Sequence, residues 1–193
     1  MGYVAPSETI RVAREMLEGG VEILQLRAKD FQVDQILKLA VPLVPICKSF
    51  GVPFIINDYA EVVVESGADG LHVGQDDMLV DKARSLIGPD KIVGLSTHSL
   101  LQAKSALQEK PDYIGFGPLF STPTKPDYTS IGTSQIIEVH RLVDLPIYCI
   151  GGIKCENLPE VLSAGAQRVA IVSGVLKAEK IVDYCRACRA LLQ

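Results

Sequence analysis

The chain has 193 residues, a length typical of one domain with a sizeable core. Hydrophobic residues make up 48% of it and charged residues 22%, which excludes an intrinsically disordered chain. The 19 Lys and Arg against 23 Asp and Glu give a formal net charge of −4, so no basic surface for nucleic acid or membrane is expected. Any anionic ligand must be held by a few locally placed cations.

The sequence also indicates the compartment in which the protein works. Its apolar runs are shorter than the roughly 18 residues that span a bilayer, and its N-terminus lacks the pattern of a signal peptide. Five cysteines, an odd number without the spacing of a disulfide framework, favour a reducing environment. We therefore expect a cytoplasmic protein with small-molecule ligands, and assembly into a homo-oligomer is compatible with this expectation.

Seven short runs rich in β-branched residues predict strands. They are almost continuously apolar, which is typical of parallel strands buried on both faces. The expected strands are Val21–Leu26, Pro53–Ile56, Gly70–Val73, Lys91–Leu95, Asp112–Phe116, Pro146–Ile150 and Arg168–Val172.

Longer amphipathic stretches alternate with these strands and predict helices. The expected helices are Ser7–Glu18, Asp34–Phe50, Asp58–Ser66, Val80–Ile87, Ser99–Gln108, Ser134–Leu142, Asn157–Ala164 and Ile181–Leu192. The expected N-caps are Ser7, Asp34, Ser99, Ser134 and Asn157.

This alternation fits either a doubly wound sheet or a (β/α)₈ barrel. No G-x-G-x-x-G follows the first strand, and polar residues follow many strands rather than one switch point. The pattern therefore favours an α/β fold, a (β/α)₈ TIM barrel with a curtailed first strand, as a single domain over residues 1–193. We expect Gly2–Ala5 to form that short strand, between Val21–Leu26 and Val169–Val172.

Polar groups at strand ends are the candidate site. Gln25, Arg27 and Lys29 share one face of a strand exit, and two cations with an amide suit a polyphosphate. The alternative is a solvated strand end with ordinary surface charges.

Two acidic strand ends indicate a magnesium site. Asp58 follows Asn57 at one strand end, and Asp76 and Asp77 follow the next strand. Carboxylates on neighbouring strand ends can share one Mg²⁺, whose remaining ligands are water and phosphate oxygens. The alternative is that Asp58 and Asp76 are N-caps of the helices that follow.

Three loops near the end of the chain can hold phosphate. The long segment after Phe116 carries hydroxyls and an ammonium group, and long loops in compact domains are usually functional. Glycines follow the last two strands, the place where barrels often bind phosphate, although turn chemistry alone would also explain them. The candidates in these loops are Thr122, Thr124, Lys125, Gly151, Gly152, Ser173 and Gly174.

Other reactive side chains have simpler interpretations. His72 lies within a strand and is interpreted as an interior residue with satisfied hydrogen bonds rather than a base. His98 and His140 have no assigned role. Cys185 and Cys188 form a C-x-x-C with no second ligand pair, which favours helix packing over zinc.

Six motifs in this order resemble the thiamine phosphate synthase family, over about residues 7–177. They are QLRAKD at 25–30, IIND at 55–58, GADGLHVGQDD at 67–77, GLSTHS at 94–99, GFGPLFSTPTK at 115–125 and IGGI at 150–153. The resemblance implies a barrel that joins an aminopyrimidine diphosphate to a thiazole phosphate and releases pyrophosphate.

The resemblance also implies roles for individual residues. Gln25, Arg27, Lys29, Asn57, Ser96 and Lys125 would contact the pyrimidine diphosphate. Asp58 and Asp77 would ligate Mg²⁺, and Thr122, Thr124, Gly152, Val172 and Ser173 would hold the thiazole phosphate. Arg27, Lys29, Ser96 and Lys125 would carry catalysis.

Two rival functions remain. The first is the thiazole tautomerase branch of the same family, which has a histidine at the position of Pro118 and lacks the aspartate at the position of Asp77, so both residues favour the synthase. The second is a degenerate barrel that binds thiamine phosphate without turnover. In the family a first strand normally precedes the first helix, whereas here residues 1–6 alone precede Ser7.

Overall fold

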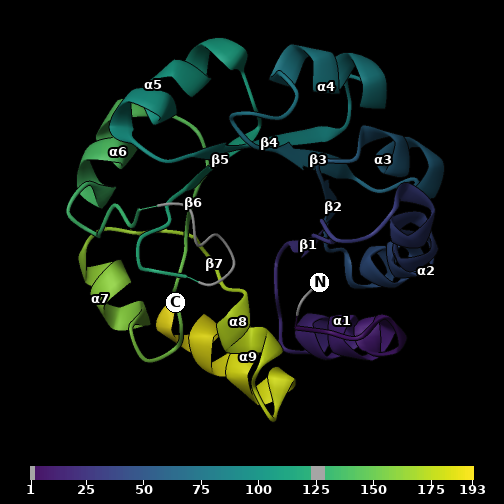
Figure 1. Ribbon diagram of the computed structural model, residues 1–193. Helices are drawn as coiled ribbons and strands as arrows, with labels where there is room; N and C mark the ends of the chain where they lie inside the picture. Colours follow the sequence, from purple (N-terminus) through teal and green to yellow (C-terminus); the bar gives the residue numbers. More distant parts are fainter. Residues whose placement is uncertain (1–2, 123–128) are drawn as a thin grey trace.

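One curled sheet of parallel strands forms the centre of the molecule, and helices surround it (Figure 1). This computed structural model describes residues 3–122 and 129–193. The described strands follow chain order in the sheet, and each pairs with its neighbours along the chain. They are β1 (Leu24–Leu26), β2 (Phe54–Asn57), β3 (Gly70–Val73), β4 (Ile92–Thr97), β5 (Tyr113–Phe116), β6 (Ile147–Ile150) and β7 (Val169–Ala170).

The helices lie outside the sheet, as parallel strands require of their crossover connections. A 3₁₀ turn, η1 (Pro6–Glu8), leads into α1 (Thr9–Glu18). The others are α2 (Val33–Phe50), α3 (Ala60–Ser66), α4 (Val80–Ile87), α5 (Leu100–Glu109), α6 (Ile136–Leu142), α7 (Leu158–Ser163), α8 (Ser173–Leu176) and α9 (Ile181–Leu191).

The apolar runs of the sequence become strands because both faces of the sheet are covered. All residues of β2, β3 and β5 are buried. Each of the seven predicted strands is confirmed, with shifts at the ends, and the four-residue helix α8 was not predicted. A helix this short has too few residues to show a 3.6-residue period.

Carboxylates fix the amino ends of two strands. Asp69 Oδ2 accepts a hydrogen bond of 2.8 Å from the backbone N–H of Phe54. Asp112 Oδ2 accepts one of 2.7 Å from Val93 N–H and forms an ion pair of 3.0 Å with Arg84. These contacts satisfy backbone donors at the amino-terminal ends of the strands, on the side of the sheet opposite the candidate site.

The N-terminal segment differs from expectation. Tyr3–Ala5 form a turn and a bend instead of a strand, so the strand predicted over Gly2–Ala5 is wrong for these residues, and Gly2 lies outside the described residues. The helical turn starting at Pro6 is the reason, because Ala5 C=O already accepts the N–H of Glu8 at 2.9 Å.

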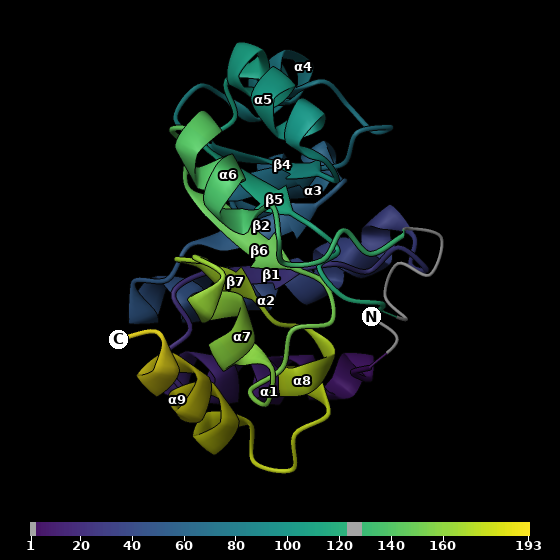
Figure 2. The same ribbon diagram turned by 90° about the vertical axis from the view of Figure 1, so that its left-hand side faces the viewer.

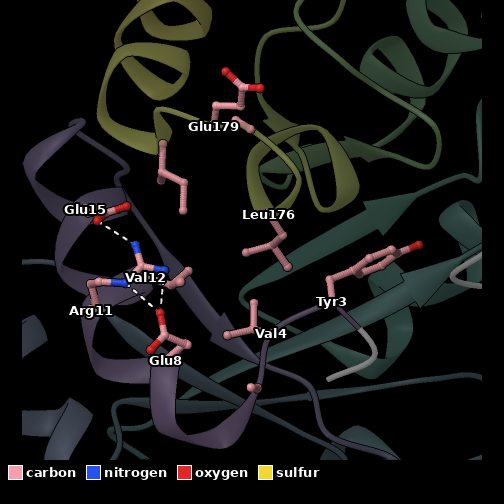
Figure 3. Close-up of a pocket in the computed structure, with 11 residues that line it drawn as sticks. Tyr3, Val4, Glu8, Arg11, Val12, Glu15, Leu176 and Glu179 are labelled. Atoms are coloured by element: carbon pink, nitrogen blue, oxygen red, sulfur yellow. Dashed lines mark hydrogen bonds and ion pairs between the residues drawn. The ribbon is translucent and has the colours of Figure 1, made fainter.

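Tyr3–Ala5 instead line a pocket of about 180 Å³ between α1, α8 and the start of α9 (Figure 3). Val4 packs against the buried cluster that contains Val12 and Val175, and Lys177 Nζ lies 5.0 Å from the centre of the Tyr3 ring. None of the predicted site residues that the structure describes lines this pocket.

β1 and β7 are consequently the two edges of the sheet within residues 3–122 and 129–193. The two residues of β7 are only half-buried, and Gln25 in β1 is exposed. The described residues thus form an α/β fold with a TIM-barrel-like, curled sheet of seven parallel strands.

The predicted helix starts are confirmed only in part. Ser99 caps α5, because its Oγ accepts the N–H of Gln102 at 3.2 Å. Asn157 stands at the N-cap of α7 without a capping side-chain bond. Ser7, Asp34 and Ser134 are not N-caps, since Glu8, Gln32 and Gln135 hold those positions. Among the described residues, every helix is too short or too polar to cross a bilayer.

Candidate active site

The carboxyl ends of the strands carry most of the predicted site residues. Because the described strands are all parallel, the segments that follow them emerge from one end of the sheet, and in Figure 2 helix α8 lies to the right of β7, the strand that it follows. Gln25 lies in β1, Asn57 ends β2 and Ser96 lies near the end of β4.

The backbone at Asp58, directly after β2, has an unusual conformation. Asp58 has a positive φ of 71°, rare for a residue other than glycine. Its N–H donates to His72 C=O of β3 at 2.9 Å, and the next N–H, that of Tyr59, donates to Asn57 C=O at 3.0 Å. This tight turn uses a strained conformation of the kind found at functional sites.

The N-cap alternative for the aspartates is wrong. The N-cap of α3 is Tyr59 and that of α4 is Leu79, so neither Asp58 nor Asp76 caps a helix. Asp77 Oδ2 instead accepts the N–H of Gly74 at 2.7 Å, which holds the loop after β3 in a tight turn.

The structure brings Asp58, Asp77 and Lys29 together. Lys29 Nζ lies 2.9 Å from Asp58 Oδ2, in a pair whose side chains are 46% and 18% exposed. Burial raises the pKa of the Asp58 carboxyl, the hydrogen bond from Lys29 lowers it, and the charge of Asp77 raises it again. Two acids from neighbouring strand ends thus share one small space.

This donor set suits a magnesium ion. Mg²⁺ is commonly bound by one or two carboxylates and completes its shell with water and substrate phosphates. Within the described part of the chain, no group of three or more His, Cys, Asp or Glu side chains could form a protein-only cage. After burial, the charge of Asp77 is a further cause of the raised pKa of Asp58, and repulsion between like charges is what a divalent cation relieves.

Asn57 adds a second sign of ligand binding. The residue is 7% exposed, and its Nδ2 is buried without a hydrogen-bond partner in the protein. Buried donors are nearly always satisfied, so an unpaired donor directly before Asp58 indicates a position where a ligand acceptor belongs. Arg27 is half-buried two residues beyond Gln25 and Lys29 is exposed, which leaves both cations at this end of β1.

Ser96 is held by a neighbouring histidine. Its Oγ lies 2.9 Å from His72 Nε2, and its C=O accepts Gln75 Nε2 at 2.7 Å. His72 is 8% exposed, and its Nδ1 lies 2.9 Å from Tyr113 Oη, so its interpretation as a satisfied interior histidine is confirmed. The contact of Tyr113 with His72 was not predicted, because a tyrosine in an apolar strand is interpreted from sequence as an ordinary core residue.

The second half of the site follows β5, β6 and β7. Gly152 has φ +66°, and a Cβ there would lie 2.7 Å from Phe120 Cβ, so glycine lets the loops after β5 and β6 touch. Val172 and Ser173 are half-buried at the start of α8. Thr122 is half-buried after β5.

Part of the predicted site cannot be placed. Thr124 and Lys125 lie outside the described residues, as does most of the segment Phe120–Thr129, for which closure over the phosphates was expected. The cysteine interpretation agrees with the structure, since Cys185 and Cys188 are buried, free thiols of α9.

Comparison with known proteins identifies the family. The sequence profile of the family described as thiamine monophosphate synthase matches residues 3–175. The thiamine-phosphate synthase of Shouchella clausii is 38% identical over 187 residues, which cover 96% of this chain and 90% of that protein. That of Halalkalibacterium halodurans is 39% identical over 183 residues, covering 94% and 87%.

A solved structure agrees with these relatives. The thiamine phosphate pyrophosphorylase of Pyrococcus furiosus superposes with a TM-score of 0.88 at 30% identity, covering 95% of this chain and 88% of that one. Sequence and fold therefore agree that the chain belongs to the thiamine monophosphate synthase family, whose members are transferases.

Proposed function

We propose that this protein is a Mg²⁺-dependent thiamine phosphate synthase. It joins 4-amino-2-methyl-5-(diphosphooxymethyl)pyrimidine to 4-methyl-5-(2-phosphoethyl)thiazole and releases pyrophosphate. The observation that carries the proposal is the neighbouring pair Asp58 and Asp77, with Lys29 Nζ 2.9 Å from Asp58 Oδ2. It occurs in a chain that is 38% identical to a thiamine-phosphate synthase. A tautomerase would not need a carboxylate pair for a metal–diphosphate complex.

The chemistry requires charge stabilisation more than a nucleophile. Pyrophosphate leaves from a benzylic-type carbon, and the electron-rich aminopyrimidine supports the cation left behind. Arg27, Lys29 and Lys125 stabilise the negative charge that grows on the leaving group, and Asn57 and Ser96 donate hydrogen bonds to the same substrate. A bound Mg²⁺, held by Asp58 and Asp77, would supply further charge neutralisation on the diphosphate.

The thiazole phosphate takes the other side of the site. Gly152 keeps the loop after β6 open to a phosphate, and Val172 and Ser173 offer the start of α8 beside it. Thr122 and Thr124 contribute hydroxyl donors from the loop after β5. Two anionic substrates are thereby bound from opposite sides of the strand ends, and the thiazole nitrogen reaches the carbon that pyrophosphate leaves.

We further propose that the active form is a closed (β/α)₈ barrel. Strands β1 and β7 are the two edges of the described sheet, and a parallel strand added between them would pair with both. The reducing cytoplasm is the proposed compartment, since all five cysteines are free.

One observation favours a second candidate function. Because Tyr3–Ala5 form no strand, β1 is an edge and Gln25 is exposed. A barrel open at this point could bind thiamine phosphate without catalysing its formation.

Product identification separates the candidates. The protein is incubated with both substrates and Mg²⁺, and the products are identified by mass spectrometry. A synthase yields thiamine phosphate and pyrophosphate in equal amounts. A tautomerase changes the thiazole substrate alone, and a binding protein retains thiamine phosphate on a desalting column without making it; either result refutes the proposal.

A further inference from the structure

A chain of hydrogen bonds crosses the interior of the sheet and ends at Ser96. The Gln25 side chain of β1 bonds the hydroxyl of Tyr113 on β5. Tyr113 Oη lies 2.9 Å from His72 Nδ1, and His72 Nε2 lies 2.9 Å from Ser96 Oγ. Four side chains from four strands thus form one connected path.

The Tyr113 ring is positioned by packing, independently of its hydroxyl. Gly94 of β4 leaves the space for the ring, because a Cβ at Gly94 would collide with Tyr113 Cζ. The ring centre lies 5.4 Å from that of His72 and 5.3 Å from that of Tyr148, the latter in an edge-on arrangement of 74°. Replacing Tyr113 with phenylalanine should therefore remove one polar atom and leave the ring in place.

The two bonds of His72 are coupled. A neutral imidazole has one donor and one acceptor nitrogen, so the direction of one bond fixes the direction of the other. If Nδ1 accepts from Tyr113, then Nε2 donates to Ser96, and the Ser96 hydroxyl proton is free for a ligand. In the reverse case, Ser96 gives its proton to His72 and offers a ligand only lone pairs.

Two arguments favour the first direction, one from Tyr113 and one from the proposed ligand. Burial raises the pKa of Tyr113, whereas the Gln25 side chain lowers it, which is the effect of an amide N–H directed at the phenol oxygen, so the phenol proton is left for His72 Nδ1. The end of the path at Ser96 lies in a site proposed for a diphosphate, and an anion requires donors rather than lone pairs.

We propose that Tyr113 is a positioning residue that sets the proton order of this path, so that Ser96 presents its O–H to the substrate. The inference rests on the proposed function for the identity of the anion. The path itself rests on the geometry of Gln25, Tyr113, His72 and Ser96 alone. Tyr113 acts through His72 and contacts no reacting atom.

The tautomer of His72 tests the path directly. Long-range ¹H–¹⁵N correlation spectra distinguish a proton on Nδ1 from one on Nε2, and the chain has only three histidines to resolve. His98→Gln and His140→Gln variants assign the signals. We expect His72 to carry its proton on Nε2 in the wild-type protein and to become a mixture of tautomers in Tyr113→Phe. Tyr148→Phe is the matched control and should leave the signals of His72 unchanged.

Kinetics give a second readout. Tyr113→Phe should lower kcat about tenfold, the effect of one misdirected hydrogen bond, with a smaller change in KM. In the Ser96→Ala background the same change should have little further effect, because its action passes through Ser96.

The two readouts separate the inference from the proposed function. A wild-type His72 with its proton on Nδ1 or on both nitrogens, or a Tyr113→Phe variant with unchanged tautomer, overturns the inference whatever the enzyme catalyses. A wild-type protein without synthase activity refutes the proposed function, and the spectra still decide the direction of the path.

Discussion

Replacing Asp77 with asparagine should weaken the magnesium site and stabilise the metal-free protein. Burial raises the pKa of the Asp58 carboxyl and the charge of the neighbouring Asp77 raises it further, against the lowering effect of Lys29. Asparagine keeps an oxygen that can accept the Gly74 N–H, now 2.7 Å from Asp77 Oδ2. The substitution thus removes one charge and little else.

The order of magnitude follows from Coulomb's law. Two unit charges about 4 Å apart repel by about 1 kcal/mol in water and about 4 kcal/mol at an effective dielectric of 20. Asp77 is exposed, which places the pair near the lower value. A gain of about 1 kcal/mol raises the midpoint of thermal unfolding by about 2–4 °C in a chain of this size.

The sign of the pH dependence follows from the raised pKa of Asp58. Stability linked to such a carboxyl is fully present below its unfolded-state pKa and is lost as pH rises through the folded-state pKa. The gain in stability of metal-free Asp77→Asn over the wild type should therefore be largest near pH 7 and become smaller toward pH 4. With magnesium bound, the wild type should be the more stable protein. Losing one of two carboxylates should lower Mg²⁺ affinity about 100-fold, or ~2.7 kcal/mol.

Differential scanning fluorimetry in EDTA and calorimetric Mg²⁺ titration measure the two effects. Asp76→Asn is the matched control, because it removes one charge from the adjacent position and should change neither quantity appreciably. The reasoning is refuted if metal-free Asp77→Asn is less stable than the wild type at pH 7, or if its Mg²⁺ affinity is unchanged.

Three further substitutions test other parts of the site. Gly152→Ala should cost about 2 kcal/mol more unfolding free energy than Gly51→Ala in urea titrations, because both have φ near +66° but only Gly152 meets another residue; equal losses would contradict this. Asn57→Leu removes the orphan donor and should lower kcat/KM for the pyrimidine diphosphate at least tenfold, and unchanged steady-state kinetics would exclude a role for Asn57. Lys125→Ala should lower kcat about 100-fold, and an effect confined to KM would show that Lys125 binds substrate without aiding departure of pyrophosphate.

Much of the fold was predictable from the sequence, because strands buried on both faces of a sheet appear as short, almost continuous apolar runs. The run Phe54–Asn57 is apolar up to its last residue, and all four residues are buried. The pairing of Asp58 with Asp77 was also predictable, since parallel strands bring their carboxyl ends to one edge.

The features that were missed depend on tertiary contacts. Tyr3 and Val4 have high strand propensity, yet Val4 packs in the cluster of Val12 and Val175 beside the turn at Pro6, which no local pattern reveals. The role of Tyr113 depends on the space at Gly94, in the neighbouring strand and 19 positions away in sequence. Such a signal requires knowing which strands are adjacent.

The rate of condensation with and without magnesium tests the central claim most directly. Pyrophosphate release from the two substrates is followed in one preparation, first with EDTA and then with excess Mg²⁺. The account predicts negligible release in EDTA and release with Mg²⁺ that matches the thiamine phosphate formed, one for one. Equal rates in both conditions, or no product with Mg²⁺ despite bound substrates, would contradict it.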